Sequence, residues 1–263
     1  MGKIIGICNK KGGTGKTTTA VNVSACLGLA GQKTLLIDMD PQCNATSGIG
    51  LAHHDKKSIY DVLMERCDIR DCIYSTSWPN LSHIPSDISL TGGEVELVNL
   101  PDRELRLKKA VEQIKEDFSY IIIDAPPSLG VLTVNVLAAS DSLIIPIQCE
   151  YYALEGVSKL VNTVELIRER LNPSLEIEGI LLTMADFRTR LTLQVIEEVR
   201  RFFQEKAFNI IIPRNVRLAE APSFAKPISF YDETCVGATA YLKLSEEVLQ
   251  RTAEIGHLVK KRS

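Results

Sequence analysis

The chain has 263 residues, of which 45% are hydrophobic and 24% are charged, and its formal net charge is -3. This composition is that of a globular protein with a sizeable core, and it excludes a disordered tail. A net charge so close to zero does not predict that the whole molecule binds nucleic acid or an anionic membrane, so any such site must be local.

The cysteine pattern and the apolar runs indicate where the protein resides. The seven cysteines are scattered, with no CxxC pair and no histidine at zinc-ligand spacing, and we interpret them as reduced thiols. The N-terminus lacks the basic and long apolar segments of a signal peptide. No apolar run approaches the roughly 20 residues that span a bilayer. We therefore expect a cytoplasmic protein without stable membrane association.

Short apolar runs alternate with amphipathic stretches along the chain. The runs predict buried strands at residues 4–8, 34–37, 120–123, 143–147, 180–183 and 209–212. Helical periodicity appears at residues 105–118, 154–171 and 193–203. Residues 52–92 are the least regular part, and we expect insertions at the rim there. The alternation predicts a single P-loop domain over residues 1–263, of doubly wound α/β class, with a mostly parallel sheet flanked by helices on both faces.

A glycine-rich loop joins the first predicted strand to the first predicted helix. The loop reads KGGTGKT at residues 11–17, and the helical stretch after it ends before Gly31. A strand, a glycine loop and a helix in this order are the context in which a P-loop binds phosphate groups. Gly12, Gly13 and Gly15 carry no side chain, so backbone N–H groups can approach a triphosphate closely. The alternative is a flexible glycine turn before a helix.

Two side chains of the loop fit the chemistry of Mg·ATP. Lys16 places a positive charge at the β- and γ-phosphates, and Thr17 offers its hydroxyl to Mg²⁺. We therefore predict ATP and Mg²⁺ as cofactors. The predicted nucleotide-binding residues of the loop are Lys11, Gly12, Gly13, Thr14, Gly15, Lys16, Thr17 and Thr18.

The loop carries a second lysine, Lys11, directly before its glycines. With it, residues 11–17 match the KGGxGK[ST] signature, and the chain resembles the deviant Walker A ATPases. In that family the extra lysine reaches the nucleotide of the partner subunit, so the resemblance implies an ATP-dependent homodimer. The alternative for Lys11 is a solvated loop lysine.

Carboxylates follow two of the predicted strands. Asp38 and Asp40 end the second run, and Asp124 ends the run at residues 120–123. The carboxyl ends of parallel strands face the crevice where ligands bind, and a strand-end Asp is the Walker B arrangement. Phosphoryl transfer requires an aligned water, a metal and positive charge. We assign Asp40 to the water, Asp38 and Asp124 to the metal shell, and the lysines Lys11 and Lys16 to charge. The alternative for each aspartate is a helix cap or a turn former.

Longer segments resemble the ParA/Soj partition ATPases over nearly the whole chain. They are DPQCNATSGIG at 40–50, IIIDAPPSLGVLTVNVLAASD at 121–141, IPIQCEYYALEG at 145–156, LLTMADFRTRL at 181–191, QVIEEV at 194–199 and IPRNVRLAEAPSFAKPI at 212–228. The resemblance implies slow ATP hydrolysis, binding of double-stranded DNA without sequence preference, and a ParB-like centromere-binding partner that stimulates turnover. It also implies that the adenine lies beside Pro213, Arg214 and Asn215, and that Arg188 and Arg217 contact DNA.

The charge distribution favours a local basic patch. Residues 186–226 carry eight Lys or Arg against five Asp or Glu, so this segment has a charge of +3 and the remainder has -6. Such a patch would contact phosphates with salt-sensitive affinity and without reading bases. The alternative for each arginine is a solvated charge on a helix or loop.

Two rival functions remain on the same loop. A membrane-cycling ATPase of the MinD type, which places the cell-division site, would need a C-terminal amphipathic helix. We expect instead that the apolar positions of residues 244–263 pack on the sheet and that only the basic tip is solvated. An iron-protein reductase would need cysteines at the dimer face to hold a cluster, and residues 125–135 contain none.

Overall fold

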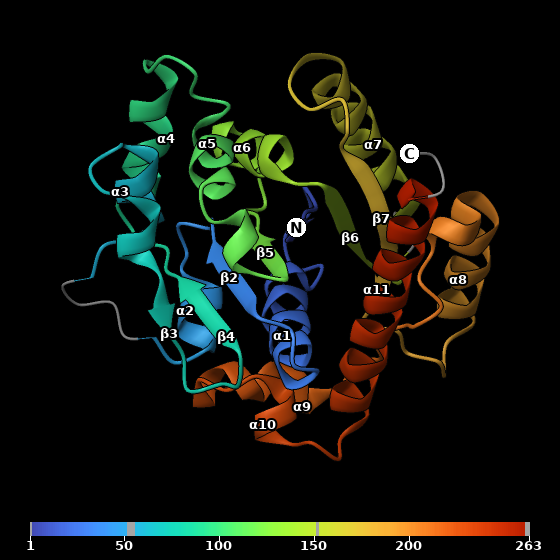
Figure 1. Cartoon of the computed structure of the whole chain (residues 1–263). Coiled ribbons are helices and arrows are strands. Elements are labelled where there is room, and N and C mark those ends of the chain that lie inside the picture. Colours follow the sequence, from blue (N-terminus) through green and yellow to red (C-terminus); the bar gives the residue numbers. More distant parts are fainter. Residues whose placement is uncertain (1, 52–55, 151–152, 261–263) are drawn as a thin grey trace.

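The computed structural model describes residues 2–51, 56–150 and 153–260, and a seven-stranded sheet lies at its centre (Figure 1). The strand order is β3-β4-β2-β5-β1-β6-β7, and only the edge pair β3·β4 is antiparallel. The predicted doubly wound, mostly parallel sheet is therefore confirmed. The strands are β1 (Lys3–Ile7), β2 (Thr34–Asp38), β3 (Tyr74–Ser75), β4 (Leu81–Ile84), β5 (Tyr120–Asp124), β6 (Ser142–Gln148) and β7 (Glu176–Thr183).

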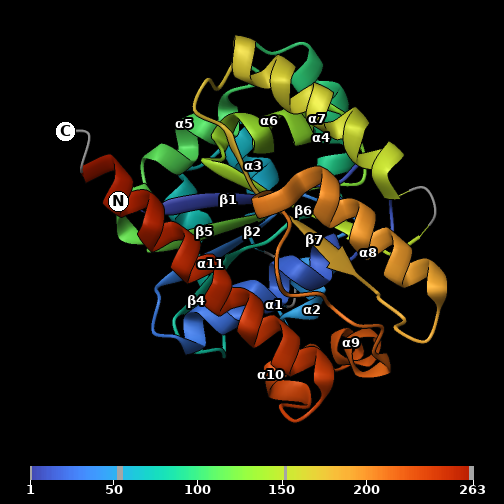
Figure 2. The ribbon, with the colours of Figure 1, turned by 90° about the vertical axis from the view of Figure 1, so that its right-hand side faces the viewer.

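Helices cover both faces of this sheet. Figure 2 shows α5, α6 and α7 above the sheet and α1, α10 and α11 below it. The three predicted helical stretches correspond to α5, α7 and α8, although α5 ends early and a short 3-10 turn (Lys115–Asp117) follows it. The α-helices are α1 (Lys16–Leu29), α2 (Asn44–Gly48), α3 (Ile59–Leu63), α4 (Leu90–Val98), α5 (Arg106–Glu112), α6 (Val131–Ala139), α7 (Ala153–Arg170), α8 (Arg190–Phe203), α9 (Val216–Glu220), α10 (Ile228–Tyr231) and α11 (Val236–Lys260).

The sheet separates two hydrophobic cores. Along β5, Ile121 and Ile123 belong to the core under α4 to α8, whereas Tyr120 and Ile122 belong to the core under α1 and α11. Successive side chains of a strand point to opposite faces, so a strand buried on both faces must be apolar at every position. This is why the central strands appear in the sequence as uninterrupted Ile-, Leu- and Val-rich runs.

Two predictions about strands were wrong. Residues 209–212 form no strand, because the backbone N–H groups of Asn209 and Ile210 donate to the carboxylate of Glu247 on α11. Within the segment, Ile212 still bonds to the end of β7 through the carbonyl of Leu182, and isolated bridges at Ala207 and Pro213 flank it. Conversely, the stretch 52–92 is not merely an insertion at the rim. It supplies β4, which pairs along β2 inside the sheet.

The first part of the C-terminal helix α11 packs as expected, and the side chains of residues 254–263 lie outside the described part of the chain. Leu244 and Val248 are fully buried, and α11 contacts α1. The basic tip at residues 261–263 lies outside the described residues. No helix in the described ranges combines the length and the apolar character that a membrane crossing requires.

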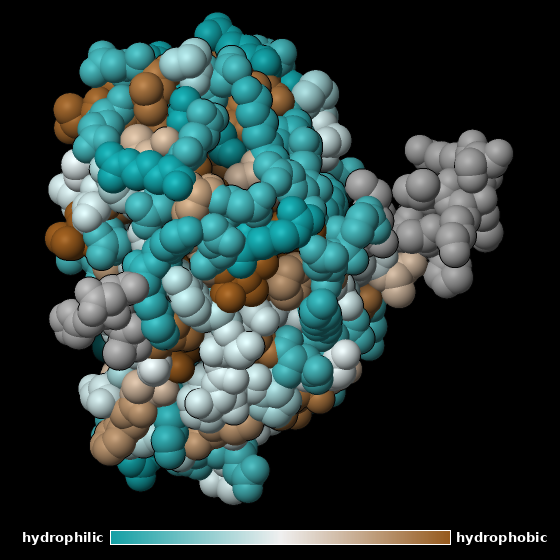
Figure 3. All heavy atoms as spheres, turned by 60° about the vertical axis from the view of Figure 1, so that its left-hand side comes forward, coloured by the Kyte–Doolittle hydropathy of each residue, from teal (hydrophilic) through white to brown (hydrophobic). Residues whose placement is uncertain are grey.

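All seven cysteines are free, as predicted. On the face shown in Figure 3, hydrophobic residues form separate patches among hydrophilic ones rather than one continuous band.

Candidate functional site

The glycine loop lies between β1 and α1. Gly13 and Gly15 have φ angles of +71° and +86°, which side chains with a Cβ rarely adopt. A Cβ on Gly13 would meet no atom within 4 Å, so backbone conformation rather than space requires glycine there. Helix α1 begins at Lys16 with no side-chain cap and no acidic residue in its first turn. Its first N–H groups and the positive end of its dipole are therefore available to an anion.

Two side chains outside the glycine motif hold this loop in place. Asn9 accepts from the backbone N–H of Lys11 at 3.0 Å and donates to the carbonyl of Pro146 at 2.7 Å. The hydroxyl of Thr183, at the end of β7, donates to the carbonyl of Thr14 at 2.8 Å. Neither side chain was predicted from the sequence, because the bonding partners lie 137 and 169 positions away.

Lys16 is a buried cation under the loop. Only 6% of it is exposed, and its Nζ donates to the carbonyl of Lys11 at 3.2 Å. Burial lowers the pKa of Lys16, and the carboxylates of Asp124 and Asp40 oppose that shift. A lysine so enclosed is fixed in position, and phosphate oxygens can satisfy its remaining donors.

Lys11 has a different environment. Its side chain is 52% exposed, and its Nζ donates to the carboxylate of Glu150 at 2.7 Å. The signature lysine is therefore paired within its own chain and does not reach into the glycine loop.

Asp124 ends β5 beside the loop and is completely buried. Neither of its carboxylate oxygens has a hydrogen-bond partner within the described part of the chain. Burial raises the pKa of Asp124 well above its usual range, and the neighbouring Asp38 raises it further. The nearby hydroxyl of Thr17 lowers it, although its geometry falls short of a formed hydrogen bond. A buried carboxyl group without a hydrogen-bond partner destabilises the folded state unless a ligand interacts with it.

Asp38 ends the neighbouring strand β2 and pairs with Asp124 in the sheet, and Asp40 lies two residues beyond the strand. Both are buried. The backbone N–H of Asp40 donates to Asp38 at 3.0 Å, and Thr46 donates to the other oxygen of Asp38 from its N–H and its hydroxyl. Burial raises the pKa of Asp38 to about 6, although the bonds from Thr46 and from the Asp40 N–H lower it. Asp40 accepts the backbone N–H of Gln42 at 2.9 Å, which bends the chain away from the strand.

The donor set around Asp124 fits Mg²⁺ bound together with a triphosphate. Among the described residues, no three His, Cys, Asp or Glu side chains cluster as a metal cage. Mg²⁺ with nucleotides usually takes only one or two protein ligands, and the phosphates and waters supply the rest. The Thr17 hydroxyl and the orphaned carboxylate of Asp124 meet that requirement.

A cleft of about 400 Å³ opens beside the start of α1. It brings Gly15 and Thr18 of the loop together with the predicted adenine residues Pro213, Arg214 and Asn215. Its other walls include the apolar side chains of Ile212, Leu218 and Tyr241. A mostly apolar slot that ends at a phosphate-binding loop suits a purine base.

Arg188 and Arg217, the predicted DNA contacts, are both exposed and both paired. The Arg188 side chain is 88% exposed and donates twice to Asp186, at 2.8 and 2.7 Å. Arg217 lies on α9 and donates to Glu220 at 2.9 Å, with Asp232 at 3.4 Å. Each guanidinium group therefore has a carboxylate competitor for any phosphate.

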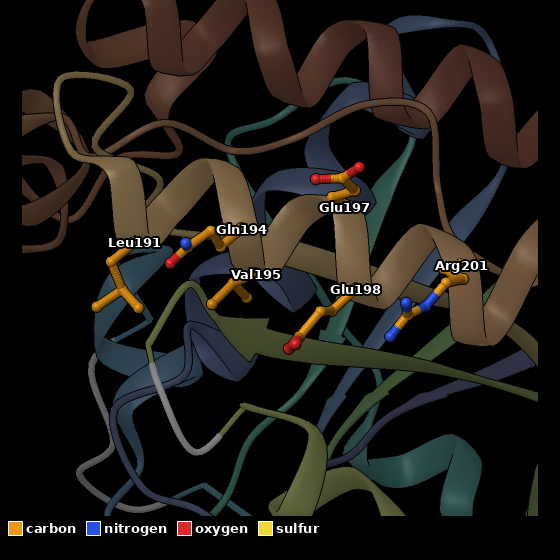
Figure 4. Close-up of a pocket in the computed structure, with 6 residues that line it drawn as sticks. All are labelled: Leu191, Gln194, Val195, Glu197, Glu198 and Arg201. Carbon is orange, nitrogen blue, oxygen red and sulfur yellow. The ribbon is translucent and has the colours of Figure 1, made fainter.

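A larger cavity of about 610 Å³ lies along α8 (Figure 4). Its lining combines the charged residues Glu197, Glu198 and Arg201 with Leu191, Gln194 and Val195. No residue of the glycine loop lines it, so the phosphate chemistry described above does not involve this cavity.

Comparison with known proteins places these features in a family. A family model described as an AAA domain matches residues 2–177. The chain is 56% identical to the sporulation initiation inhibitor protein Soj of Bacillus subtilis over 94% of this chain and 98% of that protein. It is 51% identical to the chromosome partitioning protein ParA of Myxococcus xanthus over 95% of this chain and 89% of that protein.

The fold also matches a solved structure. Cobyrinic acid a,c-diamide synthase from Mycobacterium smegmatis, with bound ADP and magnesium, superposes with a TM-score of 0.84 at 31% identity over 96% of each chain. That identity is well below the 56% shared with Soj. With most of its length matched at this level, the chain belongs to the ParA/Soj family of chromosome-partitioning ATPases.

Proposed function

We propose that this protein is a DNA partition ATPase that is switched by its nucleotide. Mg·ATP closes two copies into a sandwich dimer, and the dimer binds double-stranded DNA without sequence preference. Slow hydrolysis, stimulated by a ParB-like centromere-binding protein, then releases the DNA. The protein would act in the cytoplasm, associated with the nucleoid.

One observation carries the nucleotide part of this proposal: an orphaned, fully buried carboxylate at Asp124 lies beside the uncapped start of α1. A cation beside Asp124 would stabilise its charged form, and an anion at the helix start would accept from its free N–H groups. Mg·ATP supplies both at once. ADP and magnesium in the related solved structure support this pairing.

The loop and the strand ends would bind different parts of Mg·ATP. Lys16 and the N–H groups at Gly13 and Gly15 bind the phosphates, and Thr17 and Asp124 hold Mg²⁺. We place Asp38, also assigned to the metal shell, behind Asp124, because its oxygens already accept from Thr46 and from the Asp40 N–H. When bound there, Mg²⁺ would neutralise part of the negative charge of the phosphates. Pro213, Arg214 and Asn215 border the adenine in the cleft next to Gly15 and Thr18.

Hydrolysis would depend on Asp40, which is buried on the segment after β2. Its carboxylate orients the attacking water in line with the terminal phosphate. Lys11, whose pairing with Glu150 is largely solvated, exchanges that partner for the nucleotide of the second copy. Closure of the dimer thus adds a positive charge where the transition state needs it.

The DNA part of the proposal depends on the basic segment 186–226, which contains Arg188 and Arg217. The first part of α11 offers no surface for membrane cycling of the MinD type, because Leu244 and Val248 are buried in the core. The 56% identity to Soj also favours partition.

A co-sedimentation experiment tests the proposed function directly. The full chain is incubated with ATP and either double-stranded DNA or anionic liposomes. We expect nucleotide-dependent retention on DNA and none on liposomes, and we expect Asp40→Ala to keep ATP binding, lose hydrolysis and accumulate DNA-bound dimer. Retention on liposomes alone, or unaltered turnover in Asp40→Ala, would contradict the proposal.

A further inference from the structure

The carboxylate of Asp38 connects the two ends of the segment that carries Asp40. On one side Asp38 accepts the backbone N–H of Asp40 at 3.0 Å. On the other side its second oxygen accepts the N–H of Thr46 at 2.9 Å and the Thr46 hydroxyl at 2.7 Å. Asp38 and Thr46 are both fully buried, so water does not replace these bonds. Residues 40–46 are therefore closed into a loop by a single carboxylate.

The Thr46 hydroxyl has its full set of hydrogen bonds. It donates its one proton to Asp38, so its lone pairs must accept from the other neighbours. These are the backbone N–H of Ser86 at 3.2 Å and the Nε2 of His83 at 3.0 Å. His83 must then carry its proton on Nε2. Because His83 belongs to β4 and Ser86 follows it, Thr46 fastens the Asp40 loop to a second strand of the sheet.

This arrangement differs from that of an ordinary helix cap. The cap position of α2 is Cys43, which makes no side-chain cap bond, whereas Thr46 lies inside the short helix. Its hydroxyl bonds to groups on β2 and β4 instead of to its own helix. Hydrogen bonds to a buried charged group are stronger than neutral ones. Removing the hydroxyl proton of Thr46 should therefore loosen Asp38 and the loop at residues 40–46.

We infer that Thr46 is a positioning residue for ATP hydrolysis: it holds Asp38, and through Asp38 it sets the place of Asp40 relative to the nucleotide. This inference rests on the proposed function, in which Asp40 orients the attacking water. In the described contacts Thr46 bonds to no residue of the glycine loop, so it acts on turnover and not on nucleotide affinity.

The test compares Thr46→Val with Thr46→Ser. Valine keeps the shape and removes the proton, whereas serine keeps the proton and removes a methyl group. We expect Thr46→Val to lower kcat by about tenfold or more, with the KM for ATP changed by less than about threefold. Thr46→Ser should retain kcat within about threefold of the wild type.

A matched control is Thr34→Val at the opposite end of β2. Thr34 is also fully buried, and its hydroxyl donates to the carbonyl of Gln32 at 3.0 Å. Thr34→Val should lower thermal stability and leave kcat unchanged, so it separates the loss of a buried hydroxyl from the loss of positioning. As a second route, His83→Phe removes a donor to Thr46 and leaves the bond to Asp38, and a smaller fall in kcat is expected.

Different results would contradict the proposed function and the positioning role of Thr46. If the wild type does not hydrolyse ATP, the proposed function fails. If the wild type does hydrolyse ATP but Thr46→Val keeps its kcat, or raises KM while kcat stays constant, the positioning role is overturned. An equal loss of kcat in Thr46→Val and Thr46→Ser would also overturn it, because the proton would then not be the cause.

Discussion

The ammonium group of Lys11 donates to the carboxylate of Glu150 at 2.7 Å, so the signature lysine of the loop is engaged with its own chain. Both side chains are about half exposed, at 52% and 47%. Solvated pairs of this kind contribute about 0–1 kcal/mol, so the lysine can exchange its partner at little cost. The buried Lys16, five positions later, has no such freedom.

This contrast predicts that substitution of Lys16 impairs nucleotide binding and that substitution of Lys11 impairs dimerisation. Lys16→Ala should abolish binding of a fluorescent ATP analogue, because it removes the enclosed charge under the phosphates. Lys11→Ala should bind the analogue with similar affinity but remain a monomer in sedimentation analysis when a non-hydrolysable analogue is added. Glu150→Gln should shift the dimerisation midpoint by less than about fivefold, since the lost pair is solvated. A Lys11→Ala protein that dimerises normally would refute the assigned role.

The buried carboxylate of Asp124 predicts an unusual dependence of stability on pH. Its pKa in the folded protein is raised, mainly by burial, above the value of about 3.9 for an unfolded chain. Stability from such a group is present below the unfolded pKa and is lost as pH rises through the folded pKa. Without Mg²⁺ and nucleotide, Asp124→Asn should match the wild type near about pH 4 and become progressively more stable than it at higher pH.

Urea denaturation of both proteins in EDTA measures this difference, with Asp186→Asn as a control of opposite sign. Bonds from Arg188 lower the pKa of Asp186 to about 2, so its contribution is present above the unfolded pKa and is lost as pH falls through the folded value. The control should therefore gain no stability over the wild type at high pH. A constant difference between Asp124→Asn and the wild type at every pH would show that the pKa of Asp124 is not raised in the folded protein.

Removing the carboxylate of Asp186, which competes with DNA for Arg188, should raise the affinity for DNA. Asp186 accepts two bonds from this guanidinium group, and the arginine side chain is otherwise 88% exposed. Asp186→Asn frees the arginine and removes a negative charge, so DNA affinity of the ATP-bound dimer should rise by about two- to fivefold. Arg188→Glu should instead weaken binding and reduce the slope of log affinity against log salt by about one or more.

Anisotropy titrations of labelled duplex DNA over a range of salt concentrations measure both effects. Lys109→Glu is the matched control, because Lys109 is also exposed and paired with an aspartate but lies on α5, outside residues 186–226. An equal loss of affinity in Lys109→Glu would mean that overall charge, and not the basic segment, determines binding.

Features that depend on local chemistry could be predicted from the sequence. The glycine loop with Lys16 and Thr17 is such a feature, because the positive φ angles and the uncapped start of α1 depend on consecutive residues. The central strands are another, because burial on both faces forces uninterrupted apolar runs. The family resemblance, and not any local pattern, singled out Pro213, Arg214 and Asn215, which line one cleft with Gly15.

Features that depend on distant partners could not be predicted. Strand β4 has only four residues and carries the polar Ser82 and His83, so it lacks the apolar run of the inner strands. Residues 209–212 have such a run, yet Glu247 takes the N–H groups that a strand would use. The bond from Thr46 to Asp38 likewise depends on a turn that only the folded chain brings back to β2.

The packing of α1 leads to a prediction in which helix propensity and packing oppose each other. A Cβ on Gly28 would lie 2.3 Å from the carbonyl oxygen of Pro79, and the carbonyl of Gly28 accepts from Asn80 at 3.1 Å. Alanine gains about 1 kcal/mol of helix propensity over glycine, but a clash with backbone in a packed core costs about 1–3 kcal/mol or more. We expect the clash to dominate, so Gly28→Ala should lower the free energy of unfolding by about 1–2 kcal/mol in urea denaturation.

The control is Gly48→Ala, where the nearest atom would be Val21 at 3.9 Å, and this variant should be neutral or slightly stabilising. A Gly28→Ala protein as stable as Gly48→Ala would mean that α1 can move away from the turn at Pro79, and the phosphate-binding start of the helix would then be less rigidly held than the structure indicates.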